Sequence, residues 1–137
     1  YVANHRGEKS RSRILAGGVL RDRAFKLFRG TIDFKFGAAG AEGEEKEEVL
    51  LLGDDVINQT IPLILCAEED VQGNHGATIG RLDDELLFYL CSRGMSPEAA
   101  AKMITRARLD AVCRKIGDEA AEQMVQDYLE EVEKNGR

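Results

Sequence analysis

The feature that most constrains the fold is a change in hydrophobic periodicity near residue 80 of this 137-residue chain. Before that point, short apolar runs separated by glycines are typical of strands and turns. Ile32, Phe34 and Phe36 alternate with polar residues, and Val49–Leu52 is a short run that ends at a Gly-Asp-Asp turn signal. Short strands that recur about every dozen residues fit a sandwich, a barrel or a β-helix. Apolar runs without alternation favour stacked coils over a one-sided sheet.

Glycines and acidic residues in the first 80 positions are predicted to lie between strands. The segment from Ala38 to Glu48 is rich in glycine and contains five glutamates, whose carboxylates repel one another when they are held close. We therefore expect a solvated loop there. Turns are also expected at Gly17-Gly18, Gly30, Gly37, Gly40, Gly43, Gly53, Gly73 and Gly76.

From residue 83 the spacing of apolar residues predicts three helices. Asp83 or Asp84 can cap the first, which is expected to reach about Ser92. The sequence Ser-Pro-Glu at 96–98 is a strong start for the second, with a cap residue, a proline at the first helical position and an acid near the positive end of the helix dipole. Glycine stops are expected at Gly94 and Gly117, and Asp118 is the expected cap of the third helix.

The charge is uneven along the chain. Residues 1–30 contain eight lysines and arginines against two acidic residues, a net charge of +6, so the overall charge of −6 leaves −12 for the rest. A basic segment can bind nucleic acid or an acidic partner, or it can be the solvated outer face of a sheet. Because the chain as a whole is acidic, we favour the outer face and expect no nucleic-acid binding. No apolar run approaches the roughly 20 residues of a membrane helix, so we expect no membrane segment.

Three cysteines, Cys66, Cys91 and Cys113, lack the Cys-x-x-Cys spacing of zinc knuckles and thioredoxin-type sites. Their odd number, together with a polar and basic N-terminus, indicates a reducing compartment, and we expect a cytoplasmic protein. Cys91 and Cys113 are interpreted as small buried hydrophobic residues, whereas Cys66 is the better candidate to lie near His75. Because the chain begins at Tyr1 and not at methionine, we expect it to be part of a longer protein.

His75 is the main candidate for a functional residue. It is one of two histidines in the chain, it lies where the strand pattern gives way to the helical one, and its neighbours are small. Imidazole is a frequent ligand of transition metals, but a single histidine is also often an ordinary half-exposed residue of a turn. Sequence spacing leaves both interpretations open for His75 and favours a structural role for His5.

Several short motifs follow one another over most of the chain. They are Gly18-Val19-Leu20, Phe28-Arg29-Gly30-Thr31-Ile32, Leu50-Leu51-Leu52, Asp70-Val71, His75-Gly76-Ala77-Thr78-Ile79-Gly80-Arg81-Leu82-Asp83, Leu87-Phe88-Tyr89-Leu90-Cys91-Ser92-Arg93-Gly94-Met95-Ser96 and Glu98-Ala99-Ala100. In this order they resemble the C-terminal region of the SufB/SufD family, the scaffold proteins of iron–sulfur cluster assembly. The resemblance implies a mostly β protein with C-terminal α structure. Residues 1–81 would be the C-terminal part of a right-handed parallel β-helix, and residues 82–137 would form a small helical domain.

The resemblance also implies a non-catalytic function. The chain would be a scaffold subunit of the Suf complex, on which an iron–sulfur cluster is held transiently and shared with a partner chain. His75 would be the metal and cluster ligand, and the partner would be a SufB-like chain or a second copy. The helical domain would bind SufC, the ABC-type ATPase of this system, with Tyr89, Arg93 and Met95 as contact residues.

Two positions distinguish this chain within the family pattern. Its His75-Gly76-Ala77-Thr78 sequence is more similar to the SufD branch, because the SufB branch tends to have a glutamate at the position of Gly76. Some SufD proteins have a cysteine at the position of Gly73. Iron–sulfur clusters prefer several thiolate ligands, so one histidine needs further ligands from a partner chain or from another part of the protein.

A second hypothesis is a small-molecule hydrolase on a β scaffold, with His75 as general base and Asp70 or Glu69 nearby. The sequence has neither the G-x-S-x-G elbow of a serine hydrolase nor a second histidine in the local motif. It also lacks a Walker A glycine loop, so the chain itself is not the ATPase. The scaffold is therefore the leading hypothesis.

Overall fold

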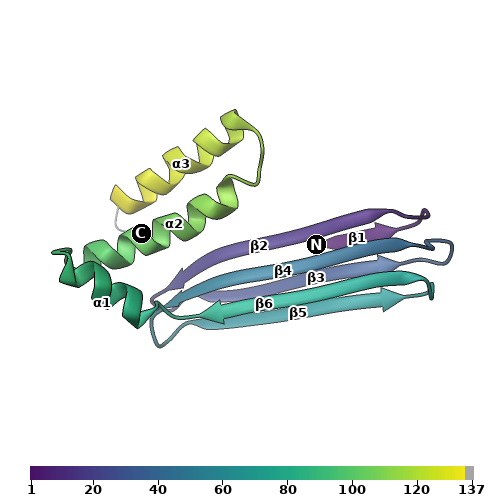
Figure 1. Cartoon of the computed structure of the whole chain (residues 1–137), viewed down its shortest axis with the longest axis horizontal. Helices are drawn as coiled ribbons and strands as arrows, with labels where there is room; N and C mark the ends of the chain where they lie inside the picture. Colours follow the sequence, from purple (N-terminus) through teal and green to yellow (C-terminus); the bar gives the residue numbers. More distant parts are fainter. Residues whose placement is uncertain (135–137) are drawn as a thin grey trace. The chain divides into compact units, whose positions relative to one another are not determined.

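The computed structural model describes residues 1–134, which form six β-strands followed by three α-helices (Figure 1). The strands are β1 (Val2–His5), β2 (Arg11–Arg21), β3 (Phe25–Phe34), β4 (Ala41–Leu52), β5 (Ile57–Cys66) and β6 (Val71–Gly80). The helices are α1 (Asp84–Ser92), α2 (Pro97–Cys113) and α3 (Glu119–Lys134). The prediction of a mostly β chain with C-terminal α structure is confirmed.

The strands form two three-stranded sheets, in the orders β1-β3-β5 and β2-β4-β6. The chain therefore passes from one sheet to the other after every strand. The pairs β1–β3, β3–β5 and β4–β6 are parallel. In Figure 1 the arrows of one sheet point opposite to those of the other. The sheets pack face to face, because a Cβ placed on Gly43 of β4 would lie 2.6 Å from Cγ2 of Ile32 in β3.

The described chain divides into two compact units. The strand unit contains Tyr1–Ala16 and Leu20–Arg81, and the helical unit contains the residues from Leu82 onward together with Gly17–Val19. In the strand unit, the completely buried residues Ile32, Phe34, Ala38 and Ala41 form the core, with Ile14 and Val71 packed against them.

The alternation predicted through Phe36 ends earlier than expected. Ile32 and Phe34 are buried, but β3 ends at Phe34, and Phe36 lies in the following turn with 88% of its surface exposed. The turn directs the chain into the opposite sheet, so the period of the strand no longer applies to Phe36.

The acidic segment Ala38–Glu48 is not the solvated loop that its charge predicted. Most of it lies in β4, the middle strand of its sheet, between β2 and β6. Successive side chains of a strand point to opposite faces, which separates the glutamates into two groups. Glu42 and Glu44 lie on the outer face and retain access to solvent, whereas Glu45 and Glu47 are buried between the sheets.

The prediction of glycine turns is also partly wrong. Gly37, Gly40 and Gly53 do lie between strands, with φ values of 89°, 70° and 138° that glycine adopts most readily. Gly17-Gly18, Gly30, Gly43, Gly73 and Gly76 lie within strands instead. Three of these face side chains of the opposite sheet, and an added Cβ would lie 2.2 Å from Glu45 at Gly30, 2.6 Å from Ile32 at Gly43 and 2.8 Å from Ile64 at Gly73.

The three predicted helix starts are confirmed. The Asp83 carboxylate accepts hydrogen bonds from the backbone N–H groups at positions 85 and 86, at 2.9 and 3.2 Å. Ser96 caps α2 through a 3.2 Å bond from the N–H of Ala99 to its hydroxyl. Asp118 accepts a 2.9 Å bond from the N–H at position 121, at the start of α3. Side-chain oxygens thus satisfy N–H groups that have no partner within the helix.

The cysteines differ in exposure. Cys113 is buried at the end of α2, as predicted for a small hydrophobic residue, and Cys91 of α1 is half-buried. Cys66, the last residue of β5, is exposed.

Candidate functional site

His75 lies in the middle of β6 and not in a turn. β6 is the last strand of its sheet, and its parallel register places His75 beside Glu45 of β4. Directly paired residues of parallel strands point to the same face, so the imidazole lies on the face where Glu45 is buried. The His75 side chain keeps 28% of its surface exposed. The imidazole therefore lies close to the buried carboxylate, and part of the ring remains accessible to solvent.

Glu45 is the unusual neighbour in this pair. The residue has 1% of its surface exposed, and neither carboxylate oxygen has a hydrogen-bond partner among residues 1–134. The nearest basic atom is Nδ1 of His75, 3.7 Å from Oε1, which is an ion-pair distance and too long for a hydrogen bond. Burial of a polar group without a partner usually costs about 1–3 kcal/mol, so this carboxylate is not explained by stability.

Gly30 of β3 makes the space for the Glu45 carboxylate. A Cβ at position 30 would lie 2.2 Å from Oε2, 2.3 Å from Cδ and 2.5 Å from Oε1. Any side chain at this position would thus occupy the volume of the carboxylate. The Glu45 carboxylate of β4 thus fills the space that a side chain at position 30 of β3 would occupy.

The next inward residue of β4, Glu47, has a complete set of partners. It is fully buried and forms an ion pair with Lys26 of β3. The Thr60 hydroxyl of β5 donates a 2.6 Å hydrogen bond to Oε2 of Glu47, and Lys26 also donates a 3.1 Å bond to Asn58. The Lys26 ammonium lies 5.2 Å from the centroid of the Phe28 ring. This cluster is satisfied from three strands.

His5 is the satisfied counterpart of His75. It is buried, and its Nδ1 and Nε2 atoms each lie 2.7 Å from a hydroxyl, of Ser10 and Ser12 respectively. Its ring packs on Phe34 at a centroid distance of 4.8 Å. Both ring nitrogens are thus used within the chain, which confirms the structural role expected for His5.

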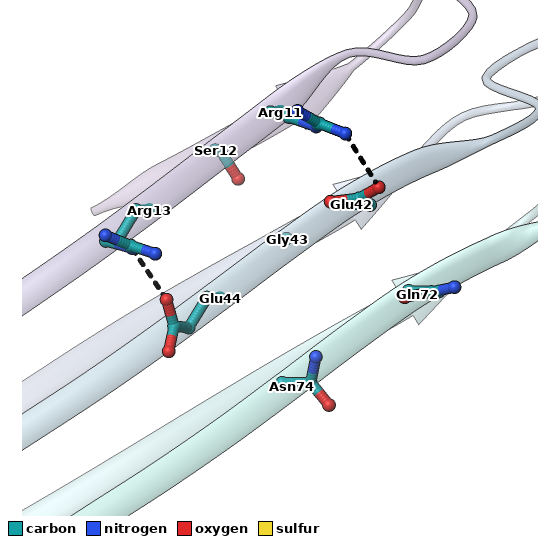
Figure 2. A pocket seen from close by; sticks show the side chains of 8 residues that line it. All are labelled: Arg11, Ser12, Arg13, Glu42, Gly43, Glu44, Gln72 and Asn74. Atoms are coloured by element: carbon teal, nitrogen blue, oxygen red, sulfur yellow. Dashed lines mark hydrogen bonds and ion pairs between the residues drawn. The ribbon is translucent and has the colours of Figure 1, made fainter.

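The outer face of the β2-β4-β6 sheet carries a shallow polar groove of about 540 Å³. Figure 2 shows two rows of side chains across the three strands, each with an arginine, a glutamate and an amide. Arg11 pairs with Glu42 at 3.2 Å, and Arg13 pairs with Glu44 at 2.6 Å. These two arginines of the basic N-terminal segment thus lie on an exposed outer sheet face and are paired with carboxylates, as the outer-face interpretation predicts.

The three predicted partner-binding residues lie in the helical unit. Tyr89 of α1 is 52% exposed, and the Arg93 guanidinium lies 5.1 Å from the centroid of its ring. Met95 is half-buried between α1 and α2. The neighbouring Phe88 has 76% of its surface exposed. The middle of α1 thus presents two aromatic rings to solvent.

A family profile described as "SUF system FeS cluster assembly, SufBD core domain" matches residues 1–108. The chain belongs to the SufBD family. The iron-sulfur cluster assembly protein SufD of Bacillus subtilis (strain 168) is 32% identical over 126 residues, which cover 92% of this chain and 29% of that protein. Its counterpart SufD in Escherichia coli (strain K12) is 34% identical over 114 residues, or 83% of this chain and 27% of the relative.

More distant SufBD relatives match in the same way. A SufBD family protein of Mycobacterium leprae (strain TN) is 28% identical over 117 residues, which cover 85% of this chain and 14% of that protein. The chain thus spans less than a third of the length of each of these SufBD proteins.

Two further findings concern the described part of this SufBD chain. Within residues 1–134, no three or more His, Cys, Asp or Glu side chains come together as a metal-binding group. Among the same residues, no helix has both the length and the apolar character needed to cross a membrane. His75 and Glu45 are a pair of potential ligands that the register of β4 and β6 brings together.

His75 was a candidate from the sequence, whereas Glu45 was not. The expected acidic neighbours, Asp70 and Glu69, precede β6, and at about 3.3 Å per residue Asp70 lies roughly 16 Å along the chain from His75. One sequence pattern could have predicted that Glu45 points inward. Every second residue is small or apolar on both sides of the two glutamates, in the series Ala41, Gly43, Glu45, Glu47, Val49.

Proposed function

We propose that this chain is part of a non-enzymatic scaffold for iron–sulfur cluster assembly. The observation that carries the proposal is the match to the SufBD core domain over residues 1–108, because that range includes both strands of the His75–Glu45 pair. The SufD proteins of two bacteria, which match most of the chain, are described by name as assembly proteins.

The proposed architecture of the strand unit is a right-handed parallel β-helix. Its support is the regular alternation of the chain between two sheets whose paired strands are parallel. Each turn of such a helix contributes one strand to each sheet, and stacked turns bury a continuous core. In this proposal residues 1–81 form the scaffold and residues 82–137 form a domain that binds a partner.

His75 is the proposed ligand for iron or for a nascent cluster, which is the cargo of the scaffold. Its ring is partly exposed and belongs to an edge strand, so a second protein can approach it. The remaining ligands would come from that partner, which is a SufB-like chain or a second copy of this chain. β5 and β6 are each an edge strand of their sheet, and the exposed Leu63, Leu65 and Ile79 lie on them.

Measurement of iron after cluster assembly tests this site. His75→Ala in the full-length protein should lower the iron and acid-labile sulfide bound per complex. Asn74→Ala is the matched control, because Asn74 precedes His75 on the same strand and points to the outer face (Figure 2). Equal iron in the two variants would remove His75 from the proposed site.

The helical unit is proposed to bind an ABC-type ATPase of the SufC kind. The exposed Tyr89 and the Arg93 guanidinium over its ring are residue types that are enriched at the energetically important positions of protein interfaces. Met95 follows Arg93 in the turn before α2 and would shape the same surface. The ATPase would supply the nucleotide-driven movement that opens or closes the cluster site.

Binding of the ATPase can be measured by pull-down and titration with the full-length protein. Tyr89→Ala and Arg93→Ala should each weaken binding at least tenfold. Tyr128→Ala is the control, because Tyr128 is an exposed tyrosine of α3 in the same unit. If all three variants bind the ATPase like the wild type, the contact surface lies elsewhere.

A further inference from the structure

The buried carboxylate of Glu45 needs a positive partner that the described residues do not fully supply. Both of its oxygens lack hydrogen bonds within residues 1–134. An isolated carboxylate is very costly to bury, so a buried one is normally matched by a positive charge, a metal ion or a proton. Glu47 shows what a matched carboxylate looks like in the same interior, because Lys26 and Thr60 both bind it.

The distance to His75 fits a bridging ion better than a direct bond. Oε1 of Glu45 and Nδ1 of His75 are 3.7 Å apart, beyond the range of a hydrogen bond. Two ligand atoms that each lie about 2.1 Å from one ion are separated by about 3.0 Å at a right angle and about 4.2 Å when opposite. The observed separation falls between these limits.

The surroundings also suit a cation. Gly30 of the facing strand leaves room for the carboxylate, because an added Cβ would collide with both oxygens. His75 is partly exposed, so it provides an entry route from solvent to the buried glutamate. A carboxylate with an imidazole is a donor set that suits borderline divalent ions such as Fe²⁺.

The geometry points to a divalent-cation site formed by Glu45 and His75, in which Glu45 is a second iron ligand from within this chain. This inference rests on the proposed function, because it names ferrous iron as the ion and adds a ligand to the site of His75. Iron would enter past the imidazole and bind Nδ1 of His75 and the Glu45 carboxylate, and water or a partner chain would complete its coordination. No covalent or redox step is involved.

Cobalt(II) is a suitable probe, because it replaces ferrous iron and its absorption bands report coordination by nitrogen and oxygen. Titration of the full-length wild-type protein should show one cobalt bound per chain at this site. Glu45→Gln and His75→Ala should each lower that affinity at least tenfold. Glu44→Gln is the matched control, because this neighbouring carboxylate lies on the opposite face of β4 and pairs with Arg13. Cobalt affinity equal to wild type in Glu45→Gln would overturn the inference.

A measurement on the unaltered protein guards against misfolding of the variants. Paramagnetic cobalt should shift or broaden the imidazole signals of His75 in NMR spectra at one equivalent. His5 serves as the internal reference, because both of its ring nitrogens already have hydroxyl partners. Unchanged His75 signals at saturating cobalt would also overturn the inference.

The test separates this site from the scaffold proposal. If His75→Ala loses assembled iron while Glu45→Gln binds cobalt normally, the two-ligand site fails and the role of His75 stands. If both variants lose cobalt but assemble iron like the wild type, the cation site stands and the cluster-ligand proposal fails.

Discussion

Glu45 and Glu47 are two residues apart on the same buried face of one strand, yet their surroundings are opposite. Glu47 has a lysine and a threonine hydroxyl, from β3 and β5, as direct partners. Among residues 1–134, the polar side chain nearest to Glu45 is the His75 imidazole of the edge strand, 3.7 Å away, and Glu45 faces a glycine. The comparison separates a carboxylate that the fold satisfies from one that the fold leaves available. Burial alone does not distinguish a structural polar residue from a functional one; the set of partners does.

The largest expected effect comes from removal of the partner of Glu47. Lys26→Met should lower the free energy of unfolding by about 3–5 kcal/mol, because it leaves a fully buried carboxylate without its ammonium. Denaturant titration of the full-length protein measures the change. Lys35→Met is the control, because Lys35 is a more exposed lysine paired with Asp33. A loss below about 1 kcal/mol for Lys26→Met would show that Lys26 and Glu47 interact no more strongly than an exposed ion pair.

The second prediction concerns the space around Glu45. Gly30→Ala should destabilise the strand unit by about 1–3 kcal/mol, since the new methyl group overlaps the Glu45 carboxylate. The same substitution in a Glu45→Ala background should cost far less, because the overlapping atoms are gone. A double-mutant cycle measures this coupling. Additive effects would mean that Gly30 is needed for its backbone and not for the room it gives to Glu45.

The third prediction is that the same substitution changes the free energy of unfolding in opposite directions at Glu45 and at Glu47. In the presence of a chelator, Glu45→Met should raise the free energy of unfolding by about 1–2 kcal/mol, because an unpartnered buried carboxylate is replaced by an apolar side chain. Glu47→Met should lower it, since Lys26 would lose its carboxylate. Thermal unfolding of both variants tests the contrast. A destabilised Glu45→Met protein would indicate that Glu45 already has an adequate partner without any metal ion.

Much of the fold could be predicted from local chemistry, and the helical part most completely. The caps Asp83, Ser96 and Asp118 are local signals, because each acts on N–H groups within three residues of itself. The error in β4 has the opposite origin. A row of glutamates predicts a loop only if the segment is considered without its neighbours in the fold. The basic partners that allow it to form a strand come from other strands of the chain, and they are Arg11, Arg13 and Lys26.

The candidate site was predictable only in half. His75 could be found because histidines are rare in this chain and because its motif resembles the SufB/SufD pattern. Glu45 becomes its neighbour through the parallel register of β4 and β6, which joins residues thirty positions apart. No local pattern fixes that register. Gly30 illustrates the same limit, because a glycine at this position predicts a turn as long as the facing carboxylate is not known.

The smallest effect is expected on the outer face of the same strand. Glu44→Gln should change the free energy of unfolding by less than about 1 kcal/mol, because the Glu44–Arg13 pair is exposed to solvent and screened by it. Thermal unfolding at low and at high salt measures the change, and the small loss should disappear in high salt. A loss as large as that of Lys26→Met would mean that the outer rows of Figure 2 are as tightly coupled as the interior. Glu44 precedes Glu45 directly, so a small effect would show that the face of β4, and not the position in the chain, determines what a glutamate does there.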